Sequence, residues 1–257
     1  MIVSFDYFYD SVVLNNPNII GNCKVADFST LSKHEMVGFS DFPVTFPSLP
    51  EPYVTTQQYL DCGQLPAGGV AIDLGGYAGI SAVAFSKAVG PSGRVIVLEP
   101  DPVSHQTAER NIARHAEVNG LNNVTLVKAA ASDKCGEIQL SAEGTLGSAI
   151  TSVIGARRGK VITVPAYTLD DIAELHQLTR CDFVKIDIEG SELPVVRSGE
   201  AFFRRFRPRV LAEAHKVNGT SCAPALVGLL ESYGYTCKVV AQDGFDALPL
   251  ILAVPTN

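Results

Sequence analysis

The stretch VAIDLGGYAGISAVAF, residues 70–85, carries the strongest fold signal in the sequence. Its first five residues are almost wholly apolar, three glycines follow within the next five positions, and a helical stretch begins at Ile80. A short apolar run bounded by glycines is typical of a buried strand, and glycines ahead of a helix mark a tight turn. The stretch therefore predicts a strand, a turn and a helix in direct succession.

The following residues repeat this alternation. Strands are predicted at residues 94–98, 124–128, 182–188 and 209–214, and helices at residues 80–89, 102–119, 169–178 and 224–233. Two helix ends have clear signals: Gly120 suits the end of the second helix, and Thr168 with Asp171 forms a capping box. Apolar strands separated by helices predict an α/β fold, a mostly parallel sheet with helices on both faces.

Several segments add to this pattern. Residues 137–141 and 160–164 predict an added hairpin, and residues 236–240 and 249–254 predict closing strands, the last of them antiparallel. The first 52 residues are rich in Phe, Tyr and Pro without a clear period, which fits either a packing extension or a lid over the site. We therefore expect an N-terminal extension at 1–52 and one domain at 53–257.

Composition narrows the class of protein. The chain has 257 residues, 46% of them hydrophobic, and a net charge of −7, which argues against a general nucleic-acid binder. No apolar run approaches the roughly 18 residues that a membrane helix needs, and the N-terminus lacks the basic region of a signal peptide. Six cysteines are scattered without a C-x-x-C pair, so we expect reduced thiols in a cytoplasmic protein and no zinc site. The sequence leaves homodimer formation open.

The glycine turn predicts one half of a ligand site. Asp73 ends the first strand, and Gly75, Gly76 and Gly79 follow at a helix start, where the backbone can approach a ligand closely. The spacing differs from the G-x-G-x-x-G of dinucleotide sites. An acid at this strand end would repel a pyrophosphate and suits a cationic ligand such as an aminoacyl group.

The next two strand ends extend this half. Glu99 lies at the tip of the second strand, where an acid can accept both hydroxyls of a ribose, and Pro100 follows it. After the third strand, Ala130, Ala131 and Ser132 are small enough to leave room for a flat base.

The stretch KIDIEGSE, residues 185–192, predicts the other half. Asp187 and Glu189 finish one strand, and Glu213 and His215 finish the next. Neighbouring strands lie about 4.8 Å apart, so these four side chains can converge on one opening. Lys185 is expected to neutralise Asp187 or Glu189, and Glu192 to favour the dipole of the helix that it begins.

These motifs together resemble one family. DLGGYAG, LEPDP, AASDKCGE, TLDD, KIDIEGSE and AEAH occur in the order typical of FkbM family S-adenosylmethionine-dependent methyltransferases, from about residue 52 to residue 215. The resemblance implies a Rossmann-like class I methyltransferase fold with a seven-stranded sheet, and methyl transfer to a small-molecule hydroxyl of the sugar, glycan or polyketide type. It places Asp73, Gly75, Gly79 and Glu99 at cofactor positions; Gly76, Tyr77, Pro100, Ala131, Ser132 and Asp187 complete the expected cofactor set. The family commonly has Asn where Tyr77 stands, so the Tyr ring is expected to reshape this end of the site.

The chemistry needs a group that helps to remove the hydroxyl proton. His215 is the expected general base because the pKa of histidine is ordinarily near 6.5, with Asp187, Glu189 and Glu213 beside it. A divalent metal held by Asp187, Glu213 and His215 is the less favoured alternative, and positioning alone is a third.

Other functions are weaker fits. An N-methyltransferase acting on a small-molecule amine remains the alternative within the class, while a nicotinamide-dependent oxidoreductase lacks its glycine motif. A non-catalytic binding module would have no reason to keep the costly acid cluster. Two basic clusters, residues 157–160 and 204–209, are expected to be solvated faces or contacts for a phosphate or an anionic membrane.

Overall fold

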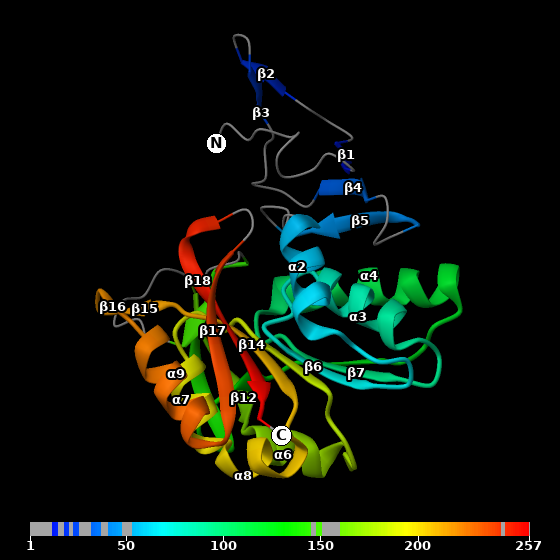
Figure 1. Ribbon diagram of the computed structural model, residues 1–257. Helices are drawn as coiled ribbons and strands as arrows, with labels where there is room; N and C mark the ends of the chain where they lie inside the picture. The colour runs from blue at the N-terminus through cyan, green and yellow to red at the C-terminus, as the bar shows by residue number, and fades with distance from the viewer. Residues whose placement is uncertain are drawn as a thin grey trace.

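The computed structural model describes residues 12–14, 18–20, 23–25, 32–36, 41–47, 53–144, 148–150, 160–242 and 245–256. Its centre is a seven-stranded sheet with the order β17-β18-β14-β13-β6-β7-β8 (Figure 1). The strands are β6 (Val70–Leu74), β7 (Arg94–Leu98), β8 (Val124–Val127), β13 (Phe183–Ile186), β14 (Arg209–Glu213), β17 (Tyr235–Gln242) and β18 (Phe245–Pro255).

All neighbouring pairs from β8 to β14 are parallel, and β18 runs antiparallel to both β14 and β17. The chain builds outward from β6 through β7 to β8 and then returns to add β13 on the other side of β6. In sheets of this kind ligands bind at the carboxyl ends of the strands beside such a reversal. The topology therefore predicts a ligand site where β6, β7 and β13 end.

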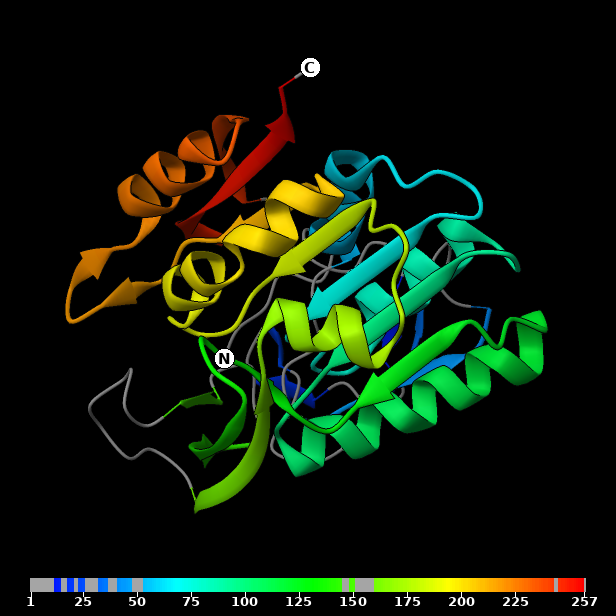
Figure 2. The same ribbon diagram turned by 90° about the horizontal axis from the view of Figure 1, so that it is seen from below.

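Helices cover both faces of the sheet. One face packs against α2 (Tyr53–Gly63), α3 (Ile80–Val89) and α4 (Pro102–Asn119), and the other against α6 (Leu169–Leu175), α7 (Glu192–Ser198), α8 (Glu200–Phe206) and α9 (Ala223–Ser232). Alternate residues of each strand explain this arrangement, because side chains of a strand point to opposite faces in turn. Ala71 packs with Tyr59 and Phe85 on the α2 and α3 side, whereas Ile72 belongs to the cluster with Phe202 on the other. Figure 2 shows α6, α7 and α8 in front of the strands.

A second sheet lies beside the first. It contains β9 (Ala130–Ala131), β10 (Gly136–Ala142), β11 (Ala149–Ile150) and β12 (Lys160–Tyr167) in the order β11-β10-β12-β9. The antiparallel pairing of β10 with β12 confirms the predicted hairpin, and β9 joins it in parallel through Ala130 and Ala131.

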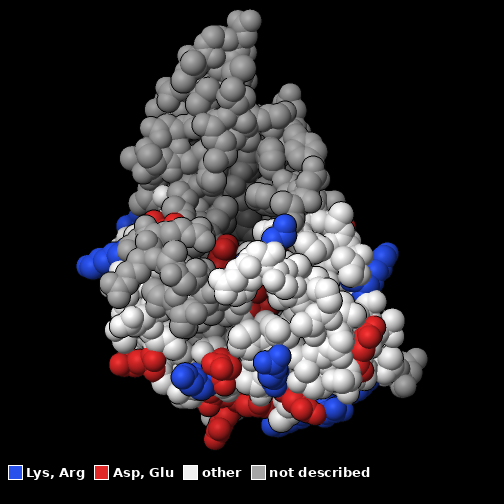
Figure 3. All heavy atoms as spheres, turned by 90° about the vertical axis from the view of Figure 1, so that its left-hand side faces the viewer, with Lys and Arg blue, Asp and Glu red and all other residues white. Residues whose placement is uncertain are grey.

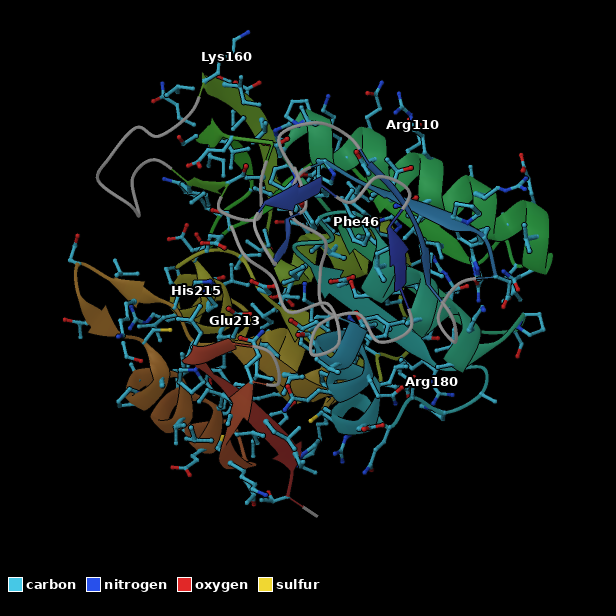
Figure 4. The ribbon with its side chains drawn as sticks, turned by 90° about the horizontal axis from the view of Figure 1, so that it is seen from above. Phe46, Arg110, Lys160, Arg180, Glu213 and His215 are labelled. Carbon is cyan, nitrogen blue, oxygen red and sulfur yellow. The ribbon has the colours of Figure 1, made fainter. Side chains whose placement is uncertain are left out.

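Part of the N-terminal extension packs on the main domain. Its described strands are β1 (Val12–Leu14), β2 (Asn18–Ile20), β3 (Cys23–Val25), β4 (Ser32–Met36) and β5 (Pro43–Phe46). Phe42, Val44 and Phe46 are buried in a cluster with Tyr77 and Ile80, and Figure 4 labels Phe46. The backbone of Thr45 is bonded in both directions to the side chain of Asn111 on α4. A role as a lid stays a prediction, since most of residues 1–52 lie outside the described ranges.

The bounds predicted from the sequence agree with the structure for the long helices. The helices predicted at 80–89 and 102–119 have those bounds, and the capping box of Thr168 with Asp171 is present. Among the described helices, α2 and α8 were not predicted, and α7 was predicted only by its start at Glu192. The strand predicted at 182–188 ends at Ile186, and the helix predicted to reach residue 178 ends at Leu175, ahead of Gln177 in the left-handed region at φ 51°. Two short strands, β15 (Lys216–Val217) and β16 (Thr220–Ser221), form a turn after β14.

Three further expectations concern the surface and the thiols. In the described part of the chain, no helix combines the length and the apolar character needed to cross a membrane. Five cysteines have described side chains, and all five are free thiols; Cys181 and Cys222 are buried, and Cys135 is exposed. Basic side chains on the face in Figure 3 are interspersed with acidic ones.

The arginines in α8 and directly after it have structural partners. Arg204 donates to Glu200 and the Ser232 carbonyl, and Arg209 donates to the Cys62 carbonyl. Arg207 donates to the Thr256 carbonyl beside the end of the sheet. Of the other predicted basic cluster, residues 157–159 lie outside the described ranges.

Candidate functional site

A cavity opens at the carboxyl ends of β6, β7 and β13. It encloses about 600 Å³ of empty space, part of it open to solvent. Its lining comes from four separate parts of the chain: Gly75 and Tyr77; Leu98, Glu99 and Pro100; Ala130, Ala131, Leu140, Ser148, Ala149 and Ile150; Asp187, Ile188 and Glu189.

Close packing around the turn after β6 requires glycine at two positions. Gly75 has φ 87°, and a Cβ atom there would lie 1.8 Å from the carbonyl oxygen of Asp187. At Gly76 a Cβ atom would lie 2.3 Å from Cγ1 of Val97. Only glycine therefore lets the turn after β6 lie directly against the loop after β13, and this contact joins the two predicted halves of the site.

Glu99 lies at the wall of the cavity, as predicted, and is 6% exposed. Its Oε2 accepts a hydrogen bond from the backbone N–H of Tyr77 at 2.7 Å, and its Oε1 accepts one from Asp101 at 2.8 Å. Burial raises the pKa of Glu99 to about 8, although both hydrogen bonds favour the ionised form. Each oxygen keeps a second lone pair, so the carboxylate can still accept from two hydroxyls.

Tyr77 lies in the left-handed region at φ 44°. Such a conformation is rare for a bulky residue and less unfavourable for Asn, which explains why a family turn of this kind commonly has Asn there. The Tyr77 ring packs in the cluster that contains Phe42, Val44 and Phe46. The residue thus connects β5 with the cavity, through its ring, and with Glu99, through its N–H.

Asp73, a predicted cofactor residue, lies behind the lining of the cavity. It is fully buried, does not line the cavity, accepts from the Ser81 hydroxyl at 2.6 Å and pairs with Lys185 at 3.2 Å. Burial raises its pKa, and the Lys185 charge and the Ser81 hydrogen bond oppose that rise. Asp73 therefore holds the turn from below through Ser81 and Lys185, and its role toward a cationic ligand stays a prediction.

Lys185 is the centre of this arrangement. Its Nζ donates to the Gly75 carbonyl at 2.6 Å and also lies 3.5 Å from Asp187. The expected pairing with Asp187 is confirmed, but its closer partner is Asp73, on the strand β6, which the sequence analysis did not consider.

Asp101 fixes the other wall of the cavity. Its Oδ1 caps α4 by accepting from Val103 and Ser104, and its Oδ2 accepts from the N–H of Gly144 and the hydroxyl of Ser148. One carboxylate therefore ties the added sheet to the start of α4. Leu140, Ser148, Ala149 and Ile150 were not predicted as lining residues. Leu140 lies in the strand predicted at residues 137–141, whereas the sequence has no signal for the other three.

The loop after β13 presents two acids to the cavity. Asp187 and Glu189 both line it, and their side chains are 26% and 28% exposed. Glu189 has φ 53°, an unfavourable conformation for a residue with a side chain. The next residue, Gly190, also has a positive φ, and together they turn the chain into α7.

Glu192 holds this loop in place. Its side chain is fully buried, and its Oε1 accepts from the N–H groups of Ile188 and Gly190 and from Nδ1 of His215 at 2.8 Å. The predicted role at the helix start was therefore incomplete, because the carboxylate mainly organises the loop that precedes the helix.

His215 lies where the sequence predicted, beside Glu213 (Figure 4), but its chemistry differs. Nε2 lies 3.5 Å from Glu213 and 3.6 Å from Glu189. Burial alone would lower the pKa of His215, but the hydrogen bonds to Glu189 and Glu192 and the charges of Glu192 and Asp187 raise it to about 12. A histidine that already carries a proton on both ring nitrogens cannot act as a base, so this geometry favours a positioning role for His215, and its predicted role as general base stays a prediction.

Glu213 completes the cluster. It is 8% exposed, and its Oε2 accepts from Nε2 of Gln242 at 2.9 Å. Burial and the charge of Asp187 raise the pKa of Glu213 to about 8, while His215 opposes the rise. Gln242 has no counterpart in the sequence motifs and was missed.

The predicted cofactor residues divide into two groups. Gly75, Tyr77, Glu99, Pro100, Ala131 and Asp187 line the cavity. Asp73, Gly76, Gly79 and Ser132 do not line it. Gly79 packs against Ala108 of α4, and the Ser132 hydroxyl turns to Asp133, so these two shape the wall from behind.

Comparisons with known proteins fit this geometry. Residues 62–237 match the family described as Methyltransferase FkbM domain. The chain belongs to the FkbM methyltransferase family. This assignment confirms the resemblance read from the motifs.

Individual relatives of this FkbM chain are distant. Methyltransferase sdnD of Sordaria araneosa is 23% identical over 211 residues, which cover 71% of this chain and 79% of the relative. The structure of methyltransferase FkbM from Methylobacillus flagellatus KT has a TM-score of 0.51 at 16% identity; it covers 77% of this chain, which spans 50% of that protein's length. Precorrin-6y C5,15-methyltransferase from Geobacter metallireducens GS-15 has the same TM-score and identity over 81% of this chain and 90% of its own. These structures confirm the Rossmann-like class I fold.

The cavity fits S-adenosylmethionine, the cofactor that the family resemblance implies. Glu99 offers two oxygens for ribose hydroxyls, and Ala130 and Ala131 leave space for a flat base. The glycine turn brings backbone to the cavity without side chains. Asp187 follows β13, its backbone carbonyl packs on Gly75 and it lines the cavity, so we expect its carboxylate to meet the aminoacyl group.

Proposed function

We propose that this FkbM methyltransferase transfers the methyl group of S-adenosylmethionine to a hydroxyl oxygen of a small molecule of the sugar or polyketide type. The observation that carries the proposal is the direct contact of the two halves of the site. The cofactor turn at Gly75 packs on the Asp187 carbonyl, and the acids Asp187 and Glu189 line the same cavity as Glu99.

The cofactor end of the cavity would hold and orient S-adenosylmethionine. Glu99 would hold the ribose, and the small residues Ala130 and Ala131 would accommodate the base, with the added sheet at Ala149 and Ile150 as a wall. When bound, S-adenosylmethionine supplies an electrophilic methyl group on a sulfonium. The protein must then hold the acceptor oxygen in line with that group at near-attack distance.

The acid end of the cavity would accept the proton of the acceptor hydroxyl. A neutral hydroxyl is a poor nucleophile, so a base must take its proton as the new bond forms. Glu189 is the residue that we assign to this role, because it lines the cavity, remains partly exposed and is held in a strained conformation. His215 and Glu192 then position the loop that carries it.

The test is a screen with cofactor carrying a ¹³C-labelled methyl group and a panel of sugars, glycans and polyketide-type alcohols. We expect S-adenosylhomocysteine to form with at least one alcohol, and the ¹³C shift of the product to identify an O-methyl group. Glu189→Gln should lower turnover by about 10²–10⁴ with little change in S-adenosylhomocysteine affinity. Glu137→Gln, on the exposed face of β10, is the matched control.

Two results would contradict the proposal. Labelled N-methyl products from an amine panel, with none from alcohols, would favour the amine alternative. Full activity of Glu189→Gln would remove this residue from proton transfer.

A further inference from the structure

Three potential metal ligands meet beyond the ends of β13 and β14. Parallel pairing places Ile186 opposite Ala212, so the next residues, Asp187 and Glu213, lie side by side. One ligand atom from each of Asp187, Glu213 and His215 lies within 4.8 Å of the other two. Figure 4 shows Glu213 and His215 from above, beside the β17–β18 hairpin.

The histidine is oriented from outside this trio. Glu192, fully buried, accepts from Nδ1 of His215 at 2.8 Å. The other ring nitrogen, Nε2, therefore faces the carboxylates of Glu213 and Glu189 at 3.5 and 3.6 Å. A carboxylate on one ring nitrogen is the usual means by which proteins orient a histidine that binds metal through the other.

A second, independent observation concerns buried oxygens at the border of the cluster. Gln242 is 5% exposed, and while its Nε2 contacts Glu213, its Oε1 has no hydrogen-bond partner among the described residues. Within the same ranges, Oε2 of the fully buried Glu192 also lacks one. Buried polar atoms without partners are rare in native proteins, and an ion or ordered water is a common reason for them.

The charges of the cluster point the same way. Asp187, Glu189, Glu192 and Glu213 face two cations, His215 and Lys185, and Lys185 is shared with Asp73 and the Gly75 carbonyl. Buried carboxylates in excess are costly unless a cation offsets them. Nε2 of His215 faces Glu213 and Glu189, at the position that a metal would take.

We propose that Asp187, Glu213 and His215 form a site for one divalent cation, with Mn²⁺ as the best fit. Carboxylate oxygens suit Mg²⁺ and Mn²⁺, whereas an imidazole ligand favours the transition metal. Three protein ligands leave further coordination positions for water or an acceptor. Because Asp187 also lines the cofactor cavity, the ion would lie at its acid end.

This inference rests on the proposed function for its chemical meaning. The ion would bind the acceptor hydroxyl oxygen and lower its pKa. The hydroxyl proton would pass to Glu189, and an oxygen lone pair would form the bond to the methyl carbon as the carbon–sulfur bond breaks. Glu189 is free for this step because the ion takes its place on Nε2.

The site is tested by metal binding alone. The full chain is treated with EDTA, dialysed and titrated with MnCl₂ by calorimetry and electron paramagnetic resonance. We expect one site per chain, and ¹⁴N modulation in pulsed spectra that disappears in His215→Gln. Asp187→Asn and Glu213→Gln should each weaken Mn²⁺ binding at least about tenfold, and Glu192→Gln by about 10–100-fold, as for other residues that orient a ligand. Glu137→Gln should bind like the parent.

The outcomes separate the two proposals. Absence of saturable Mn²⁺ binding, or binding that is unchanged in correctly folded Asp187→Asn and Glu213→Gln, overturns the metal site whatever the enzyme methylates. Methylation of alcohols in EDTA would leave the proposed function standing without the ion. Mn²⁺ bound by these residues in a protein that methylates no alcohol would support the site and overturn the function. Melting curves confirm that each variant is folded.

Discussion

At the scale of single residues, the site depends on how each buried charge is compensated. Glu99 receives two backbone N–H groups, Asp73 receives Lys185 and Ser81, and His215 is surrounded by acids. The sequence predicted where these groups lie, because strand ends are readable from alternation. It could not predict most of their partners, since a turn, helices and another strand supply them, and these partners shift the pKa values.

Glu99 should make nucleoside binding depend on pH. Its pKa is raised to about 8 in the folded protein by burial, above its ordinary value of 4.5, so it is mostly protonated at pH 7 and ionised at pH 9. Ribose hydroxyls donate to the ionised form. Methylthioadenosine, which has no group that titrates in this range, should therefore bind about tenfold more weakly at pH 7 than at pH 9. Calorimetry at both pH values measures this.

The control for that experiment is Glu99→Gln, whose affinity for methylthioadenosine should not change with pH. The same raised pKa has a consequence for folding: the folded protein binds more protons than the unfolded chain between about pH 4.5 and 8. Glu99 thus lowers the free energy of unfolding as the pH rises through that window. A pH-independent affinity in the parent protein would contradict the assignment.

Lys185 and Asp187 should have opposite effects on stability. Lys185→Met leaves Asp73 buried without its cation and should lower the free energy of unfolding by about 3–5 kcal/mol. Asp187→Asn removes a partly exposed acid that repels its neighbours, while Lys185 keeps Asp73 and the Gly75 carbonyl. Its stability without added divalent ions should be equal or slightly higher, with most activity lost. Chemical denaturation of both variants measures the difference.

A buried ion pair with no link to catalysis predicts otherwise. Both variants would then lose stability, and activity would fall only as far as folding does. A stable and fully active Asp187→Asn protein would contradict a catalytic role of this loop.

At the scale of elements, the sequence was most informative where local signals were long or had caps. The helix at 80–89 lies between Gly79 and Gly90, and the helix at 102–119 has Asp101 as its N-cap, Pro102 at its start and Gly120 at its end. The bounds of both helices were predicted correctly. The helices α7 and α8 are seven residues each and follow each other across Gly199 without a side-chain cap. Such short elements are stabilised by burial of Val195 and Phe203 in the core, which is tertiary information.

The cavity wall from the added sheet illustrates the same limit. Residues 137–141 predicted a strand, but its placement over the cofactor depends on one long-range contact, from Asp101 to Gly144 and Ser148. Residues so far apart in sequence show no common pattern. The contacts by which Asp101 caps α4 are local in the sequence, whereas its contacts with Gly144 and Ser148 are long-range.

Asp101→Asn should separate those two roles. Asn caps a helix about as well as Asp, so its carbonyl oxygen can keep the bonds from Val103 and Ser104. Its amide cannot accept from the Gly144 N–H, although the Ser148 hydroxyl can rotate to accept. We expect S-adenosylhomocysteine affinity to fall by about 1–2 kcal/mol while stability barely changes.

Calorimetry and melting curves together measure this separation, and Asp101→Ala, which loses both roles, is the matched comparison. Equal losses of stability in the two variants would show that the wall does not depend on the second oxygen of Asp101.

At the scale of the whole molecule, the cavity joins segments that are far apart in the chain. The lining residues come from the ends of β6, β7 and β13 and from the added sheet. A ligand that touches all four segments can bind only when the sheet and its reversal are formed. Cofactor binding should therefore stabilise the whole domain and not a single loop.

S-adenosylhomocysteine, the product formed from the cofactor, should raise the melting temperature of the protein, and NAD should not. At a concentration of S-adenosylhomocysteine 100 times its Kd, linkage gives about 2.7 kcal/mol of added stability. For a chain of this size that corresponds to roughly 5–10 °C. Differential scanning fluorimetry measures the shift, and Glu99→Ala should reduce it. A larger shift with NAD than with S-adenosylhomocysteine would contradict the cofactor assignment.

The left-handed conformation of Tyr77 has an evolutionary consequence. Asn is less strained than Tyr in this conformation. Asn and Tyr codons differ by a single base, so an exchange needs only one mutation. What retains Tyr is the ring's place among Phe42, Val44 and Phe46. The identity of residue 77 should therefore covary with the N-terminal segment across related chains: lineages that lose these apolar residues should return to Asn, and lineages that keep them should keep an aromatic ring.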